Sequence, residues 1–200
     1  MSKPLAPETA RAFFAIPLEA ALLEQIRKIQ TSLQGRLPNE AARWTQREHL
    51  HLTLRFLGDV PVGVIGELTS ALERACKSVP PLRLMAGQLG CFPDFRKPRI
   101  IWIGIDGDLK HLNELHDRLV SETDSLITHT EDRPFHPHLT IGRVKSSHAR
   151  VMRQCGETVQ AMNIAQIGEW TARQVDLFKS DLSSSGPTHT LLAMAPLETA

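Results

Sequence analysis

The chain has 200 residues, of which 42% are hydrophobic and 22% are charged. This composition supports a substantial core and excludes wholesale disorder. With 23 Lys and Arg against 22 Asp and Glu, the formal net charge is +1, which argues against a protein that coats duplex nucleic acid through bulk charge. No apolar run approaches the roughly 18–20 residues of a membrane-spanning helix, and the first residues lack the apolar region of a secretory signal.

Three cysteines, Cys76, Cys91 and Cys155, are too scattered for a disulfide framework, and none forms a Cys-x-x-Cys pair. An odd number of thiols in a chain without a secretory signal favours a reducing compartment. We therefore expect a cytoplasmic protein with three ordinary thiols and no membrane partner.

The first half of the chain alternates predicted strands and helices. Residues 11–16 form a short strand-like run, and residues 22–33 repeat apolar side chains at helical spacing. Polar and apolar residues then alternate over 49–56, as in a strand. A second helical stripe covers 65–75, and alternation returns over 82–89.

The second half repeats this order. Residues 99–105 predict a strand, and Asp106 or Asp108 can cap the helix that follows. Residues 136–141 predict another strand, and a short helix follows, capped by Ser146 or Ser147 and reaching about Gln154. The remaining strands are expected near 161–170, 173–179 and 189–195, with residues 183–187 as the hairpin turn before the last one.

Interleaved strands and helices with hairpin-like connections predict an α+β fold in which two sheets face each other. We expect residues 10–196 to form a single bilobal domain. Its approximate halves are residues 10–92 and 99–196, with the lobes interleaved.

One tetrapeptide occurs twice. His51-Leu-Thr-Leu54 and His138-Leu-Thr-Ile141 are nearly the same, lie 87 residues apart (138 − 51), and each falls in the second predicted strand of its half. Composition alone predicts roughly 0.6 His-x-Thr matches in a chain of this length. Two copies in equivalent strands therefore indicate a shared function.

The spacing suits phosphoryl chemistry. Residues i and i+2 of a strand share a face, about 6.6–6.8 Å apart, so each tetrapeptide presents an imidazole and a hydroxyl together. One neutral imidazole can take a proton from water while one imidazolium protonates a leaving oxygen. The hydroxyls of Thr53 and Thr140 can donate hydrogen bonds to phosphate oxygens, where charge builds in the transition state.

Basic residues flank both tetrapeptides, as expected for an anionic ligand. Arg143 is of special interest because it follows Gly142, where the backbone can bend. By strict alternation Arg143 would face away from His138, so its participation requires that bend. The flanking residues are Arg43, Arg47 and Arg55 for the first tetrapeptide, and Arg133, Arg143 and Lys145 for the second.

At these residues the sequence resembles the two-histidine (2H) phosphoesterases, specifically the RNA 2′,3′-cyclic phosphodiesterases, also called 2′–5′ RNA ligases. The resemblance covers residues 10–196 in order. It implies a bilobal α+β fold of two duplicated lobes, whose antiparallel sheets face each other across a central cleft. The segments that carry it are residues 11–16, Trp44, 51–58, 99–104 and 133–143.

The resemblance also implies the reaction and its residues. RNA ends with a 2′,3′-cyclic phosphate are hydrolysed to 2′-phosphate ends, without metal or cofactor. By motif position, His51 matches the proton donor to the leaving 3′-oxygen and His138 the proton acceptor that activates water. Thr53, Thr140 and Arg143 match phosphate-binding residues. The family further implies reversible 2′–5′ joining of RNA ends such as tRNA halves, and we expect a monomer.

Base recognition is less defined, because the chain contains no tyrosine. A stacking platform must then come from other rings, and Phe56 is our first candidate. Trp44 and Phe13 or Phe14 are further candidates.

Several alternatives remain open. His49 and His136 extend each tetrapeptide to His-x-His, a pattern that can bind a metal on a strand, although we expect no metal site. The substrate could instead be a small cyclic nucleotide or an ADP-ribose cyclic phosphate. The chain could also be a non-catalytic RNA-binding module. The basic segment 92–99 is equally a connector or a rim for RNA.

Overall fold

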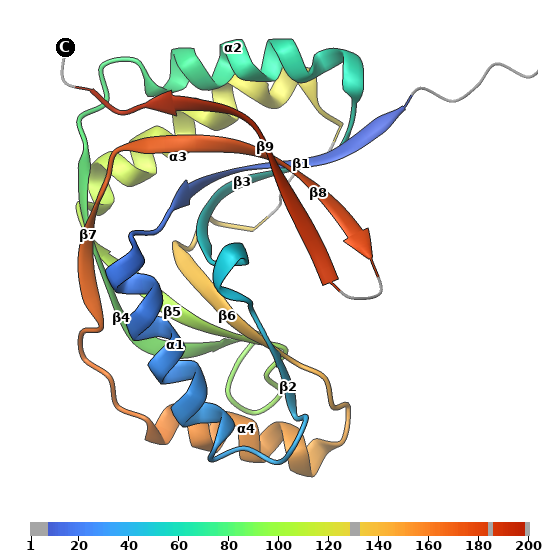
Figure 1. The fold of residues 1–200 in the computed structure, drawn as a ribbon, viewed down its shortest axis with the longest axis vertical. Coiled ribbons are helices and arrows are strands. Elements are labelled where there is room, and N and C mark those ends of the chain that lie inside the picture. Colours follow the sequence, from blue (N-terminus) through green and yellow to red (C-terminus); the bar gives the residue numbers. More distant parts are fainter. Residues whose placement is uncertain (1–7, 129–132, 184–185, 199–200) are drawn as a thin grey trace, which may run out of the picture.

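A computed structural model describes residues 8–128, 133–183 and 186–198 (Figure 1). Short 3-10 turns at Arg47–His49, Val62–Val64 and Asp124–Leu126 link some of the main elements. The helices are α1 (Ala20–Gln34), α2 (Ile65–Cys76), α3 (Leu109–Thr123) and α4 (Ala149–Ala161). The strands are β1 (Thr9–Pro17), β2 (Ala42–Trp44), β3 (His51–Pro61), β4 (Leu82–Phe92), β5 (Ile100–Gly107), β6 (His138–Val144), β7 (Gly168–Ala172), β8 (Gln174–Ser183) and β9 (Gly186–Pro196).

The strands form two antiparallel sheets, which confirms the predicted α+β class. The four-stranded sheet has the order β3-β1-β8-β9, and the five-stranded sheet has the order β2-β6-β5-β4-β7. Each sheet takes strands from both halves of the chain. That the lobes arose by duplication stays a prediction.

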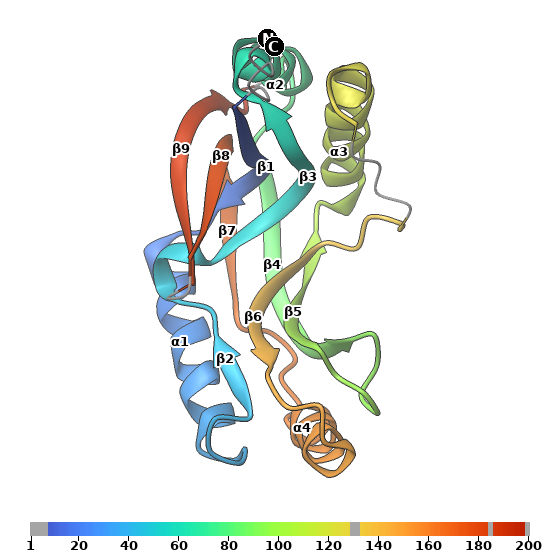
Figure 2. The ribbon, with the colours of Figure 1, turned by 90° about the vertical axis from the view of Figure 1, so that its right-hand side faces the viewer.

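Two pairs of helices cover the sheets on opposite sides. Helices α2 and α3 contact the four-stranded sheet, whereas α1 and α4 contact the five-stranded sheet. Figures 1 and 2 show the first pair at one end of the molecule and the second pair at the other. The apolar stripe of each helix is buried against strand residues in one continuous core. The helices leave the opposite face of each sheet uncovered, and the histidines of the two tetrapeptides lie on that face.

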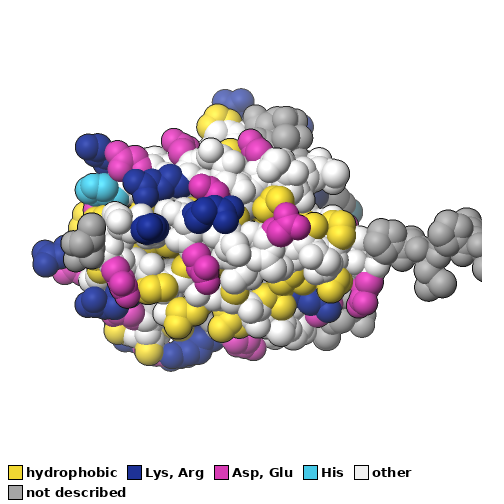
Figure 3. All heavy atoms as spheres, turned by 90° about the horizontal axis from the view of Figure 1, so that it is seen from above, with side chains coloured by type: hydrophobic (Ala, Val, Ile, Leu, Met, Phe, Trp, Pro, Cys, Tyr) yellow, Lys and Arg dark blue, Asp and Glu magenta, His cyan; other side chains and the backbone are white. Residues whose placement is uncertain are grey.

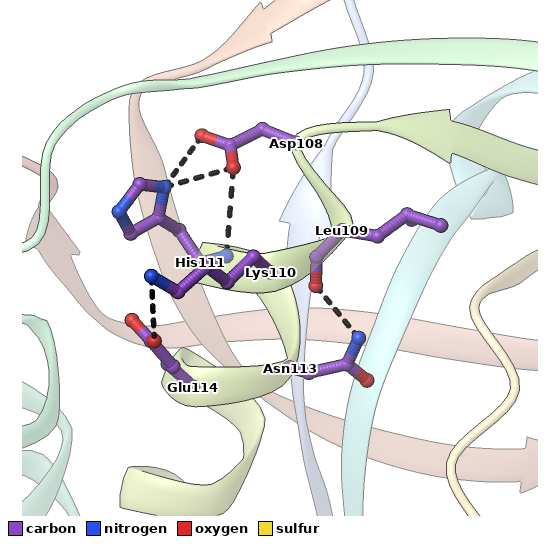
Figure 4. A network of polar contacts seen from close by, with 6 residues as sticks. All are labelled: Asp108, Leu109, Lys110, His111, Asn113 and Glu114. Atoms are coloured by element: carbon purple, nitrogen blue, oxygen red, sulfur yellow. Dashed lines mark hydrogen bonds and ion pairs between the residues drawn. The ribbon is translucent and has the colours of Figure 1, made fainter.

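The start of α3 shows how the sequence sets an element boundary. Asp108, one of the two predicted caps, accepts a hydrogen bond from the backbone N–H of His111 at 3.5 Å and contacts its ring Nδ1 at 2.8 Å (Figure 4). The Asn113 side chain donates to the Leu109 carbonyl at 2.6 Å. A capping carboxylate satisfies an N–H group that the first helical turn leaves unpaired.

Helix α4 differs from its prediction. It follows His148 rather than a serine cap, and it continues past Gln154 to Ala161. Gly156 lies within this helix, although glycine weakens a helix. A Cβ atom at this position would lie 1.7 Å from the Phe95 carbonyl oxygen. Packing against the 92–99 segment thus requires the glycine within the helix.

On the outer surface near α2 and α3, positive and negative side chains are mixed. Figure 3 shows Lys and Arg side chains interspersed with Asp and Glu on this face. Arg74 of α2 and Glu122 of α3 form an ion pair at 2.7 Å. Across the described residues, the helices are all too short or too polar to cross a membrane.

Candidate active site

A β-bulge follows the first His-x-Thr motif. Leu54 is an extra residue in β3, since the pairing with β1 shifts between Thr53 and Arg55. The register pairs His51, Thr53 and Phe56 with Pro17, Ala15 and Phe13 of β1, and pairs Arg55 with Phe14. The first three partners alternate along β1 and so share one face. Phe56 therefore projects from the face of His51 and Thr53, while Arg55 is turned to the core side.

The same irregularity follows the second motif. Ile141 is the extra residue in β6, because Thr140 pairs with Trp102 of β5 and Gly142 pairs with Ile101. Arg143 pairs with Ile100, which shares a face with Trp102. Arg143 is thereby brought to the face of Thr140 and its side chain is exposed.

The two tetrapeptides therefore share geometry as well as sequence. In each, the fourth residue is the bulge, and the residue two positions later returns to the histidine face. Phe56 and Arg143 occupy these equivalent positions. The bend that Arg143 needs comes from Ile141, whereas Gly142 makes room for a ring: its Cβ would lie 3.0 Å from Trp44.

His51 lies in an aromatic cluster on the four-stranded sheet. Phe13 stacks on its ring with centroids 4.8 Å apart, and His189 of β9 meets it edge-on at 5.5 Å. His189 also lies 4.8 Å from the ring of His49. The His51 ring is hydrogen-bonded to the backbone of His49. Three imidazoles from two strands and a short turn thus gather around one position.

His138 lies among rings of the five-stranded sheet. Its Nδ1 atom is 2.6 Å from the His136 carbonyl oxygen, so the Nδ1–H donates. Phe92 meets the ring edge-on at 5.0 Å, and Trp102 lies 6.4 Å away. A proton fixed on Nδ1 leaves the lone pair of the neutral ring on Nε2. His138 is therefore in the tautomer that a proton acceptor needs.

The strands that carry the two motifs are neighbours. β3 and β6 contact each other although they belong to different sheets. Thr53 and Thr140 are half-buried beside their histidines. Two distant stretches of chain are thereby brought together, and each contributes one imidazole and one hydroxyl.

Packing shifts the protonation of His51. Burial, followed by the nearby His189 and His49 rings, lowers the pKa of His51 to about 3, against the raising effect of its bond to the His49 backbone. Burial and His49 also lower the pKa of His189. A desolvated imidazole loses its charged form first. His51 is consequently neutral at pH 7 before any anion binds.

This shift predicts an acid-sensitive fold. The unfolded chain binds a proton at His51 near pH 6.5, but the folded chain binds it only near pH 3. Stability is therefore fully present above pH 6.5 and falls as the pH drops toward 3. We expect His51→Phe, which suits the aromatic cluster, to lose less unfolding free energy between pH 7 and pH 4 than the wild type. Urea unfolding at both pH values measures this, and an equal loss in both proteins would refute it.

Arg55 does not belong to the site, which corrects its prediction as an anion-binding residue. Its side chain is 6% exposed, donates to the Leu119 carbonyl at 3.1 Å and forms an ion pair with Asp124. The bulge at Leu54 causes the difference, because it turns Arg55 away from the face that His51 and Thr53 share. Arg55 instead anchors β3 to the end of α3.

Mutations separate this structural role from catalysis. We expect Asp124→Ala to lower the free energy of unfolding by about 2 kcal/mol, because the buried guanidinium loses its partner while solvent already screens the exposed carboxylate. Arg55→Met should cost less, since no buried charge remains. Neither change should alter kcat/KM more than about twofold. A folded Arg55→Met protein with about tenfold lower kcat/KM would return Arg55 to ligand binding.

Most of the aromatic side chains around His51 were not predicted from the sequence, and His189 is the clearest case. His189 is half-buried beside His51, although no motif in the sequence singles it out. Alternation predicted the strand over 189–195, but nothing local indicates that β9 lies in the same sheet as β3. The long-range order β3-β1-β8-β9 decides this.

The His-x-His pattern has an explanation without a metal. In both strands the catalytic candidate bonds to the backbone of the residue two positions earlier, His49 or His136, so that residue contributes its carbonyl. Within the described part of the chain, no three His, Cys, Asp or Glu side chains lie close enough to hold a metal ion.

Two antiparallel sheets that each present a His-x-Thr motif define the two-histidine phosphoesterases, as the sequence resemblance implied. A family model described as the 2′-5′ RNA ligase superfamily matches residues 16–182. The chain belongs to this superfamily. A relative named RNA 2′,3′-cyclic phosphodiesterase, from Methanothermobacter thermautotrophicus, is 28% identical over 180 residues, which cover 90% of this chain and 95% of the relative.

Solved structures agree on the fold. A Thermus thermophilus protein matches with a TM-score of 0.79 at 24% identity, over 94% of this chain and 98% of that one. Escherichia coli LigT complexed with 3′-AMP matches with a TM-score of 0.75 at 27% identity, over 95% and 99%. The matches extend over both sheets and therefore over both motifs.

Proposed function

We propose that this protein hydrolyses RNA 2′,3′-cyclic phosphate ends to 2′-phosphate ends. The observation that carries the proposal is the pair of equivalent His-x-Thr-bulge strands, which lie against each other from two sheets. The relative named RNA 2′,3′-cyclic phosphodiesterase supports the same reaction.

The two histidines divide the proton transfers. His138, with its Nδ1–H held by the His136 carbonyl, accepts a proton from water at Nε2 as the water oxygen attacks phosphorus. The bond from phosphorus to the 3′-oxygen breaks, and His51 donates a proton to that oxygen. Thr53 and Thr140 donate hydrogen bonds to the non-bridging oxygens, where negative charge accumulates. The phosphate stays on the 2′-oxygen.

Because the pKa of His51 is low, the substrate must also promote the protonation of this histidine. A proton donor must be charged, whereas His51 is neutral in the unliganded protein. A phosphate anion beside the ring favours the imidazolium, and it does so strongly where solvent is excluded. Substrate binding therefore promotes the protonation of His51.

The residues two positions after each bulge, Phe56 and Arg143, flank the reacting centre. Phe56 is 40% exposed and lies 5.8 Å from Phe13, so one face can accept a base. Arg143 supplies positive charge at the equivalent position. With a 5′-hydroxyl in place of water as the nucleophile, the same displacement breaks the bond from phosphorus to the 3′-oxygen and joins the RNA ends through a 2′–5′ linkage, and this joining is reversible.

Cytoplasmic action by a monomer completes the proposal. The three cysteines are free and buried. Burial raises the pKa of Cys76 and of Cys91 to about 12, so these thiols resist the deprotonation that disulfide exchange requires.

The deciding experiment incubates the protein with an oligonucleotide that ends in a 2′,3′-cyclic phosphate and identifies the hydroxyl that keeps the phosphate. We expect a 2′-phosphate product. Parallel reactions with a cyclic mononucleotide and with an ADP-ribose cyclic phosphate test the alternative substrates. Binding of the oligonucleotide without hydrolysis would favour an RNA-binding module instead.

Chelation tests the role of metal. We expect EDTA to leave the hydrolysis rate unchanged within about twofold, because imidazoles and hydroxyls supply every proton and hydrogen bond in the scheme. Initial rates with and without EDTA measure this. A loss of activity that a divalent ion restores would identify a metal at the His-x-His pairs.

A further inference from the structure

Two arginines lie directly opposite each other on β2 and β6. The register pairs Arg43 with Arg143, and both side chains are exposed. Cross-strand partners of an antiparallel ladder project from the same face of the sheet. The bulge at Ile141 makes this the face of Thr140. Two guanidinium groups therefore lie on the face of Thr140.

A buried side chain holds this arrangement. Gln30 of α1 is 9% exposed, and its Nε2 donates to the Thr45 carbonyl at 2.8 Å and to the Ile141 carbonyl at 2.9 Å. The backbone N–H of Thr45 donates to the same Ile141 carbonyl at 3.0 Å. Like charges placed opposite each other destabilise a ladder. The fold nevertheless fixes the bulge that keeps Arg143 beside Arg43.

We propose that Arg43 and Arg143 form a second anion subsite, which binds a backbone phosphate of an RNA strand next to the reacting cyclic phosphate. Through β5, Arg143 lies one i, i+2 step from Thr140, or about 7 Å. A phosphate between the arginines is thus adjacent to the reacting group rather than identical with it. Guanidinium groups bind phosphate oxygens through paired hydrogen bonds. Gln30 is the positioning residue of this subsite.

The subsite predicts which class of substrate the protein prefers. This prediction rests on the proposed function, which assigns the cyclic phosphate to the His-x-Thr motifs. A cyclic mononucleotide carries only the reacting phosphate, so it cannot occupy both places. An oligonucleotide can. The arginine pair therefore selects strand ends over mononucleotides.

Arg43→Gln tests the selection. We expect kcat/KM to fall about tenfold for a short RNA with a 2′,3′-cyclic end and to stay within about twofold for the cyclic mononucleotide. The dependence of log kcat/KM on log salt should become shallower by about 0.7 for the RNA. As a control, Lys110→Gln removes the same charge from the start of α3 (Figure 4). It should leave kcat/KM unchanged for both substrates.

Gln30→Met tests the positioning role. This change should reduce the preference for RNA over the mononucleotide, as Arg43→Gln does. The control is Gln34→Met, because Gln34 is exposed on the same helix, and it should leave the preference unchanged. An equal loss for both substrates would make Gln30 merely structural. If Gln30→Met does not fold, Gln30→Asn, which keeps a shortened amide, replaces it.

Equal effects of Arg43→Gln on the two substrates, or no effect on either, would overturn the subsite. If the wild type hydrolyses neither substrate, the proposed function fails on its own. Fluorescence anisotropy with the same RNA, ending in a phosphate, then decides the subsite. Roughly tenfold weaker binding by Arg43→Gln supports it, and unchanged binding overturns it.

Discussion

Replacing either His51 or His138 with Ala should lower kcat at least about 100-fold with the fold intact, because each substitution removes one of the two proton transfers. The loss should fall on kcat rather than KM, since proton transfer occurs only in the transition state. The double variant should be little worse than either single one, as groups that act as a unit are not additive.

Single-turnover rates at saturating substrate measure this, and circular dichroism verifies the fold. His148→Ala is a suitable control, because His148 is exposed next to α4 and should have no effect. A variant that keeps near-normal kcat would remove that histidine from the mechanism.

The second large effect should come from the hydroxyls. Thr53→Val and Thr140→Val preserve the shape of the side chain but delete the donor to a phosphate oxygen. We expect kcat to fall by about 100-fold for each, in the range measured for single donors to a developing oxyanion.

Thr→Ser at each position retains the hydroxyl and should recover most of the activity. Comparison of the Val and Ser variants at saturating substrate therefore isolates the hydrogen bond from the packing of the methyl group. Equal losses in both variants would mean that packing, and not the donor, supports turnover.

Most strands and helices could be predicted from the sequence because they carry a local periodicity, whereas β2, with three residues, is too short to show one. Residues 11–16 predict β1, and the stripe over 22–33 predicts α1, both within a few residues. The repeated tetrapeptide similarly predicted the candidate site, since matched strands at equivalent positions can be recognised without knowledge of the fold.

The bulges could not be predicted, and they decide which side chains join the site. A single extra residue reverses the alternation, so it sends Arg55 to the core and brings Arg143 and Phe56 to the histidine face. The bulge in β6 depends on Gln30, whose contact with Ile141 spans 111 residues of sequence. Neither the contact nor the shift leaves a local pattern.

The exchange of strands between the sheets has a consequence for the integrity of the molecule. Severing the backbone between β4 and β5 would leave β1 and β3 without β8 and β9, and β2 and β4 without their partners β5, β6 and β7. Each fragment would expose the edges of two unfinished sheets, which favour aggregation unless the other fragment covers them. Neither half of the chain can therefore complete a sheet without the other half.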